Sequence, residues 1–366
     1  VYALYRLDRK QAATRLRQHK RWYIIGGILG GILLLGGSAS LYTLKKDSAD
    51  GRFLMWKITT KAIQKQPITG TSLGGFPAAY AETQAEYMAS GKATEQEKLV
   101  AGCPEYAFNE YLQIGLEQGL VGLALFIGWL GLLFYKGIKN KRYACCGGLM
   151  SLAIFAFSSY PLQLPEFWVV LIFLGVMSVT PDKDEIRENQ AESNGHRWGK
   201  QIFFMGIAIL GIGLFWMQKD HYKAYQQWNK AQMFYNNKAY EAALEVYEPL
   251  YPLLKHKPEF LFEAAQSLSK TGQYEKANEY LERAVLLSSD PMLYYVMAKN
   301  EQCLGEYRQA EKHLLHAIDI LPERIYPYYL LMNLYTEPSY FQPAKLKMAI
   351  DSVLTKKPKV ESLSLI

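Results

Sequence analysis

Cysteine and histidine are scarce in this chain, and neither forms a recognisable ligand cluster. Its 366 residues include four cysteines and six histidines. They form no Cys-x-x-Cys pair and no Cys/His group with zinc-ligand spacing, so a disulfide framework and a structural zinc site are excluded. Clustered carboxylates and a Walker or dinucleotide-binding glycine fingerprint are also missing. We therefore expect neither a metal ion nor a cofactor.

The last 149 residues have no net charge, although the whole chain carries a net charge of +7. Residues 218–366 contain 18 Lys/Arg and 18 Asp/Glu, so the whole excess (23 minus 16) lies in residues 1–217. There the basic residues stand between long apolar runs. Such a pattern indicates membrane topology and argues against nucleic acid as a partner.

Five apolar stretches are candidates to span a bilayer, which takes about 17–25 residues. They are residues 22–44, 119–134, 143–159, 162–179 and 202–217. Pro161 and Pro165 break the helix between the third and fourth stretches, which predicts a tight re-entry there. We expect an all-α protein: a polytopic helical membrane domain over 1–217, then an α-solenoid over 218–366.

The basic residues also predict how the spans are oriented. Residues 1–21 contain seven Lys/Arg, residues 136–142 four and residues 181–201 four, whereas residues 160–166 contain none. Under the positive-inside rule, the three basic segments are cytoplasmic. Residues 45–118, 160–166 and 218–366 are then outside the cytoplasm.

An internal repeat begins after residue 221. Four tyrosines recur at spacings of 34, 33 and 33 residues, and an alanine follows each of the first three at plus three. The tyrosines are Tyr240, Tyr274, Tyr307 and Tyr340, and the alanines are Ala243, Ala277 and Ala310. Small residues at fixed places let paired helices approach closely. The segment resembles a tetratricopeptide (TPR) array of three clear repeats and a degenerate fourth, in which Pro343 replaces the alanine. The resemblance implies a protein partner on the array.

The outward segment 45–118 is too long for a simple connector and carries three short motifs. The first is Gly51-Arg52 followed by Trp56, and the second is a glycine-rich stretch from Gly70 to Phe76. The third is Phe108-Asn109, separated by nine residues from Gly119-x-x-Gly122. In this order they resemble the O-antigen ligase and polymerase family of membrane glycosyltransferases. Phe108 departs from that family, which has histidine at this position.

The resemblance implies a reaction in the bacterial inner membrane, on its periplasmic side. An acceptor hydroxyl of lipid A core, protein or glycan attacks a polyprenyl-pyrophosphate-linked glycan. An arginine that meets the departing pyrophosphate would stabilise its charge, which makes Arg52 the first catalytic candidate. Asn109 and Glu110 are the others, Glu110 because a shielded carboxylate could replace the missing histidine as base.

Four further residues are candidates for substrate binding, namely Trp56, Gly70, Gly74 and Gln113. The glycines could bend backbone amides around phosphate, although an ordinary turn explains them equally well. Membrane lipids are the remaining expected partner. Because family enzymes have about twice as many spans, and this chain starts at Val1 without a signal peptide, we expect it to be a fragment.

A second reading is a non-catalytic membrane scaffold whose TPR array recruits envelope or polysaccharide-assembly proteins. Phe108 and the small number of spans favour it.

Overall fold

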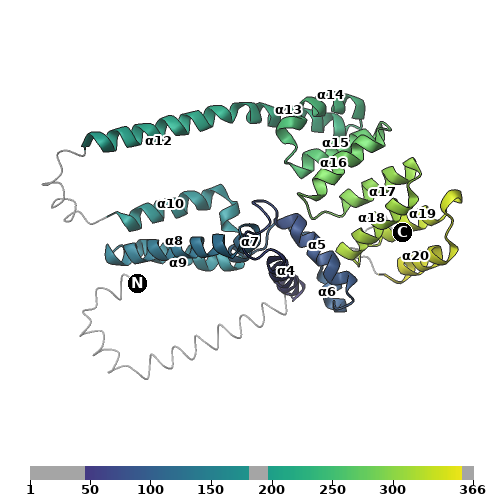
Figure 1. The fold of residues 1–366 in the computed structure, drawn as a ribbon, viewed down its shortest axis with the longest axis horizontal. Helices are drawn as coiled ribbons and strands as arrows, with labels where there is room; N and C mark the ends of the chain where they lie inside the picture. Colours follow the sequence, from purple (N-terminus) through teal and green to yellow (C-terminus); the bar gives the residue numbers. More distant parts are fainter. Residues whose placement is uncertain (1–45, 181–196, 357–366) are drawn as a thin grey trace, which may run out of the picture. The chain divides into compact units, whose positions relative to one another are not determined.

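The computed structural model describes residues 46–180 and 197–356, and within them every regular element is a helix. The chain forms two compact units (Figure 1). Of the described residues, one unit combines 46–70 with 106–180, and the other combines 71–105 with 197–356. The long loop 45–118 is thus shared between the units, whereas the sequence analysis treated it as one segment of the membrane domain.

The first unit is a small helical bundle, and two further helices from the loop 45–118 pack at one end of it. Its elements are α4 (Lys46–Lys65), α7 (Glu110–Glu117), α8 (Gly119–Lys139), α9 (Tyr143–Ser158), η1 (Pro161–Gln163) and α10 (Pro165–Val179). Helices α8, α9 and α10 enclose a core of leucines that includes Leu133, Leu149 and Leu171. The break predicted between the third and fourth apolar stretches is present, because η1 starts at Pro161 and α10 at Pro165.

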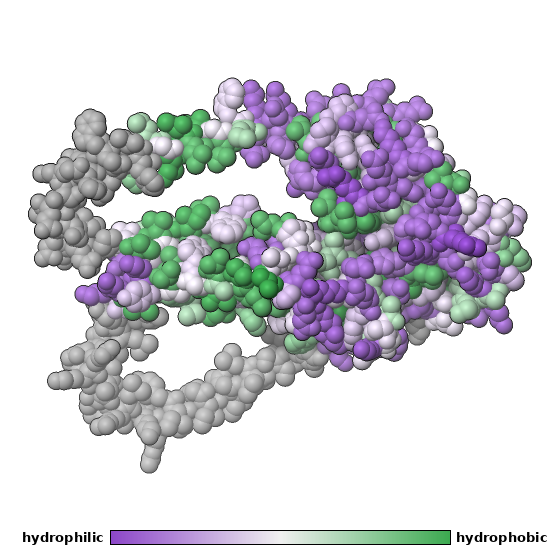
Figure 2. All heavy atoms as spheres, in the orientation of Figure 1, coloured by the Kyte–Doolittle hydropathy of each residue, from purple (hydrophilic) through white to green (hydrophobic). Residues whose placement is uncertain are grey.

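The outer surface of this bundle is apolar (Figure 2). Leu125, Ile154 and Phe173 are exposed by 71, 65 and 62%. Among the described residues, α8 alone has both the length and the hydropathy that a membrane span needs, while α9 and α10 are shorter apolar helices of 16 and 15 residues. The predicted spans from residue 119 to 179 are therefore helical, but a polytopic bundle remains a prediction. The predicted span 22–44 lies outside the described residues.

In the second unit, the first helix after residue 196 is α12 (Arg197–Met217), which contains the predicted span 202–217. Four antiparallel helix pairs follow: α13 (Lys219–Asn236) with α14 (Tyr240–Leu254), α15 (Pro258–Lys270) with α16 (Tyr274–Val285), α17 (Met292–Leu304) with α18 (Tyr307–Ile320), and α19 (Tyr326–Tyr335) with α20 (Pro343–Thr355). Ala243, Ala277 and Ala310 are fully buried between paired helices, as the repeat predicts. The TPR-like array is confirmed.

The fourth pair differs from the other three, as the sequence analysis expects. Tyr340 lies in a short 3₁₀ turn, η2 (Pro338–Tyr340), and not at the start of a helix. Helix α20 begins only at Pro343, since proline is favoured at the first helical position. Two of the other turns use glycine where the chain needs a positive φ, at Gly272 (82°) and Gly305 (79°), whereas the α13–α14 turn has Lys238 (61°) there.

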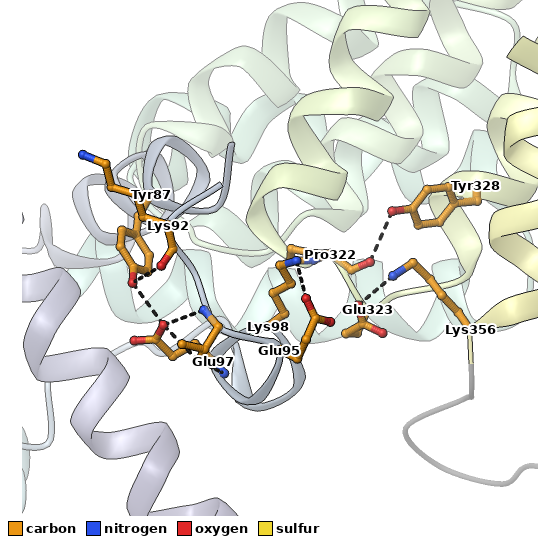
Figure 3. Close-up of polar contacts among 10 residues, drawn as sticks. Tyr87, Lys92, Glu95, Glu97, Lys98, Pro322, Glu323, Tyr328 and Lys356 are labelled. Carbon is orange, nitrogen blue, oxygen red and sulfur yellow. Dashed lines mark hydrogen bonds and ion pairs between the residues drawn. The ribbon is translucent and has the colours of Figure 1, made fainter. Parts of the chain in front are cut away.

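Residues 71–105 fold onto this array. Helix α5 (Phe76–Ala89) packs against α18, and α6 (Glu95–Val100) follows after a short turn. Helix α6 starts with a capping box, in which the Thr94 hydroxyl accepts from Glu97 N–H and the Glu97 carboxylate accepts from Thr94 N–H (Figure 3). Tyr87 also donates to Glu97 at 3.0 Å, which ties α5 to α6.

Candidate functional site

The predicted site residues of the first unit gather at one end of the α8–α10 bundle. Three segments meet there: the first turns of α4, residues 106–110 before α7, and the connection from Ser158 to Gln163. The sequence analysis placed the first two in the outward loop and identified the third only as a short outward connection. Their contacts bring Arg52, Asn109 and Glu110 into one region.

Arg52 lies on α4 with its side chain exposed. Its Nη1 donates a hydrogen bond to the carbonyl oxygen of Ser158 at 3.2 Å. The guanidinium carbon lies 5.2 Å from the centroid of the Phe108 ring, within the range of a cation–π contact. A guanidinium has five N–H donors, so this arrangement orients the group while leaving donors for an anionic ligand.

Phe108 therefore contacts Arg52 directly from the position where the related family has histidine. Its backbone has a φ of +50°, a left-handed conformation that is unusual for a bulky residue. Its ring packs edge-to-face on Tyr160 at 4.8 Å, and Tyr160 stacks on Tyr106 at 5.1 Å. The strained backbone is held by packing on both sides, as is common at functional sites.

Trp56 lies one turn after Arg52 and anchors the same segment. Its Nε1 donates to the carbonyl of Ala107 at 3.1 Å, and its ring meets Phe157 edge-to-face at 5.6 Å. Trp56 thus joins α4 to the residue before Phe108 and to the last turn of α9. These contacts hold the segment before Phe108, and substrate binding by Trp56 stays a prediction.

Asn109 and Gln113 are buried, with only 3 and 4% of their surface exposed. Asn109 is the N-cap of α7, and its Oδ1 accepts from Leu112 N–H at 3.1 Å. Gln113 accepts from Ala107 N–H at 3.0 Å and donates to Glu117 at 3.2 Å. Both side chains fix the backbone around Phe108.

Glu110 is 1% exposed and holds the 158–163 connection in place. Its Oε1 accepts from Leu162 N–H at 2.6 Å, and its Oε2 accepts from Gln163 Nε2 at 3.3 Å. Burial raises the pKa of Glu110, while the hydrogen bond from Leu162 opposes that rise. Both oxygens are engaged within the protein, so this carboxyl group is a structural tie between two segments of the site.

The two candidate glycines fall in different compact units, since the division follows Gly70. Gly70 has a φ of +69°, and a Cβ there would lie 2.5 Å from the backbone of Glu117. Gly119 has a φ of +70°, and a Cβ there would lie 2.0 Å from the Ile68 oxygen. These glycines let the 67–70 turn pack on the α7–α8 junction. Gly74 has a φ of +76° and open space around it, as in an ordinary turn.

Sequence reasoning missed Tyr160, Ser158 and Leu162, which supply a ring, a carbonyl and an amide to the site. The one signal that could have indicated them was topological, because residues 45–118 and 160–166 were assigned to the same side of the membrane. Across residues 46–180 and 197–356, no group of three or more His, Cys, Asp or Glu side chains is placed to hold a metal ion.

Comparison with known proteins confirms the two resemblances stated from the sequence. Residues 12–127 match the family model described as O-antigen ligase, and this stretch contains Arg52, Asn109 and the whole loop 45–118. Residues 236–317 match the model of anaphase-promoting complex (cyclosome) subunit 3. No curated protein matches the chain.

Several solved structures are similar to the repeat region. A crystal structure of MamA protein is 18% identical, covers 36% of this chain and 71% of its own, and has a TM-score of 0.33. The Yersinia enterocolitica type III secretion chaperone SycD, in complex with a peptide of the translocator YopD, is 19% identical. It covers 34% of this chain and 91% of its own, with a TM-score of 0.28.

Proposed function

Because the chain carries an O-antigen ligase segment over residues 12–127 and TPR-like repeats, we propose that it is a membrane glycosyltransferase of the O-antigen ligase type. It transfers a polyprenyl-pyrophosphate-linked glycan to a hydroxyl acceptor on the periplasmic side of the inner membrane. The acceptor belongs to lipid A core, a protein or another glycan. The repeats bind a protein partner or the acceptor.

The contacts within the first unit support the proposed membrane arrangement. One end of the α8–α10 bundle carries the site and the 158–163 connection, which contains no basic residue. At the other end, Asn140 of the basic 136–142 loop donates to the Ser178 and Val179 oxygens at the end of α10. Helix α8 has 21 residues, which span about 30 Å at 1.5 Å per residue, the thickness of the hydrocarbon core. The bundle thus has the basic 136–142 loop at one end and the 158–163 connection, without Lys or Arg, at the other, as alternating spans require.

The exposed guanidinium of Arg52 is the observation that carries the mechanism. The acceptor oxygen bonds to the anomeric carbon, the bond from that carbon to the pyrophosphate oxygen breaks, and the hydroxyl proton leaves to water. Negative charge develops on the departing polyprenyl pyrophosphate. Arg52 is held by Ser158 and Phe108 with donors to spare, so it can meet that charge without reorganising.

The remaining site residues position Arg52 and the segment around Phe108. Trp56, Asn109 and Gln113 each bond the backbone between residues 107 and 112. Glu110 holds the segment that presents the Ser158 carbonyl. We assign Glu110 this positioning function in place of the base, because both of its oxygens accept hydrogen bonds.

The experiment that tests the proposal compares Arg52→Ala and Arg52→Lys in cells that supply the lipid-linked glycan. Loss of a preorganised charge contact costs on the order of 10²–10³ in rate, so Arg52→Ala should lose glycan transfer. Arg52→Lys should recover part of it, because an ammonium keeps the charge but not the planar fork. Lys46→Ala, at the exposed start of the same helix, is the matched control and should retain activity.

A scaffold function is the second candidate, and Phe108 favours it. A phenylalanine can neither accept nor donate a proton at the family's histidine position, and here its ring covers one face of Arg52. Full glycan transfer by Arg52→Ala at normal expression would contradict the enzyme proposal and leave the scaffold as the better reading.

A further inference from the structure

The second unit contains a groove of about 920 Å³ that the described repeats do not fill. Helices α15, α17 and α19 contribute to its walls, together with the turn from Ser288 to Pro291. Cys103 and Glu105 of the loop segment 71–105 form another part of the wall. The groove is therefore built jointly by the TPR-like repeats and by the loop of the O-antigen ligase segment.

The loop part of the wall is fixed by hydrogen bonds. Ser289 donates to the Pro104 carbonyl at 3.2 Å. The Gln84 side chain is fully buried, and its Nε2 donates to the carbonyls of Gly102 (3.0 Å) and Ile320 (2.8 Å). These bonds hold residues 102–104 against the repeats, so Glu105 has a defined place at the edge of the groove.

The groove carries an excess of negative charge. Four carboxylates line it, from Glu105, Glu259, Glu263 and Asp290, against one guanidinium from Arg324. Glu263 is already engaged, since it accepts from Trp228, Gln232 and Tyr247. Glu105, Glu259 and Asp290 are exposed, and none of the ion pairs formed within residues 46–180 and 197–356 includes them.

An aromatic surface lies beside these carboxylates. Tyr295 is buried in the wall, while Tyr326 meets it edge-to-face at 5.4 Å and is 41% exposed. Phe262 contributes a half-buried ring to the same lining. Open aromatic rings among carboxylates can bind the aliphatic stems of lysine and arginine and their charged ends at once.

We propose that this groove binds an extended polypeptide segment that carries lysine or arginine next to apolar side chains. A ligand that covers the groove must displace water from three exposed carboxylates, one of which, Asp290, accepts a backbone hydrogen bond from Met292 N–H. Removing that water is costly unless cations replace it. A neutral glycan brings hydroxyl groups but no compensating charge. Charge complementarity therefore selects a basic peptide over a sugar.

The proposal goes beyond glycan transfer and is tested by binding alone. The probe is a fluorescein-labelled Gly/Ser peptide with interspersed lysines and tyrosines, titrated with the full chain in neutral detergent. Two further probes serve as controls. One is the same peptide with glutamates in place of the lysines, and the other is a labelled dextran oligosaccharide. We expect the lysine peptide to bind, with an affinity that falls as salt is added, and the other two to bind much more weakly.

The variant Glu105→Gln/Glu259→Gln removes two exposed charges from the groove and should weaken lysine-peptide binding about tenfold. Glu275→Gln/Glu282→Gln removes two exposed charges from α16, outside the groove, and should leave binding unchanged. Equal binding by both double variants, or preferred binding of the dextran probe, would overturn the inference. Arg52→Ala should bind the peptide normally, so loss of transfer and loss of peptide binding report on separate proposals.

Discussion

Arg52 and Phe108 form the contact on which the proposed mechanism depends. Arginine keeps its charge at every physiological pH, and the Phe108 face and the Ser158 carbonyl fix its direction. The neighbouring carboxyl group, Glu110, is buried and bonded to Leu162. The charge proposed to meet the substrate and the carboxyl group that holds the backbone thus belong to different residues with different surroundings.

Phe108→His should be tolerated. Histidine is more common than most residues in left-handed backbone conformations, so the φ of +50° should persist. The loss of one cation–π contact should change the free energy of unfolding by no more than about 1 kcal/mol. Thermal unfolding in detergent measures this, and the glycan-transfer assay shows whether the histidine raises activity. Phe108→Leu, which has no ring, is the comparison; an unfolded Phe108→His protein would contradict the prediction.

Glu110→Gln should change how stability depends on pH. The pKa of Glu110 is raised above 4.5 in the folded state, chiefly by burial, so its contribution is fully present below pH 4.5. The contribution is lost as the pH rises through the folded-state pKa, because the buried group must then ionise. Glutamine stays neutral throughout. As the pH increases above 4.5, the melting temperature of Glu110→Gln should therefore rise relative to that of the wild type. A difference between the two melting temperatures that does not change with pH would refute this.

The junction between α7 and α8 requires a glycine at residue 119. The chain turns at Gly119, where Leu120 N–H donates to the Pro67 oxygen at 2.8 Å and the 67–70 turn packs closely. The Asn109 cap starts α7, and Gly119 starts α8 with a φ of +70°. The nine-residue spacing between Asn109 and Gly119 is therefore the length of one short helix and its turn.

Gly119→Ala should destabilise the first unit by more than about 2 kcal/mol, because a Cβ would collide with the Ile68 oxygen at a backbone angle that suits glycine. Gly128→Ala, in the middle of the same helix, meets nothing within 4 Å and should be neutral or slightly stabilising. Thermal unfolding of the two variants in one detergent gives the comparison. Similar melting temperatures would show that the close packing at Gly119 is unimportant.

At the scale of the whole molecule, the loop 45–118 serves both compact units. Its ends, with α4 and residues 106–118, build the proposed transfer site, and its middle, residues 71–105, packs on α18. The inserted segment 71–105 therefore packs on the repeats, while both of its ends continue into segments of the proposed site.

The proposed topology places the carboxyl terminus in the periplasm. The 15 Lys/Arg in the three inward segments, against none in residues 160–166, predict that a reporter active only in the periplasm gives signal when fused after Ile366. The same reporter fused after Lys139, within a basic loop, should be silent, and a cytoplasmic reporter there should be active. The reverse pattern would overturn the orientation and the periplasmic site together.

The repeat architecture could be predicted from the sequence because it depends on local rules. The 33- and 34-residue spacing and the buried alanines follow from the packing of neighbouring helices, and the structure has the alanines buried where the pattern predicts. The family resemblance likewise depended on short ordered motifs such as Gly51-Arg52 and Asn109, and the family model matches over them.

Only the tertiary structure decided which contacts the individual site residues make. Sequence spacing could not show that Glu110 holds Leu162, that Phe108 covers Arg52, or that residues 71–105 pack on the repeats and leave the rest of their loop. These contacts join segments dozens to hundreds of residues apart, as in the bond from Gln84 to Ile320. Local periodicity determines helices and their pairing, whereas burial and hydrogen bonding between distant segments depend on how the whole chain packs.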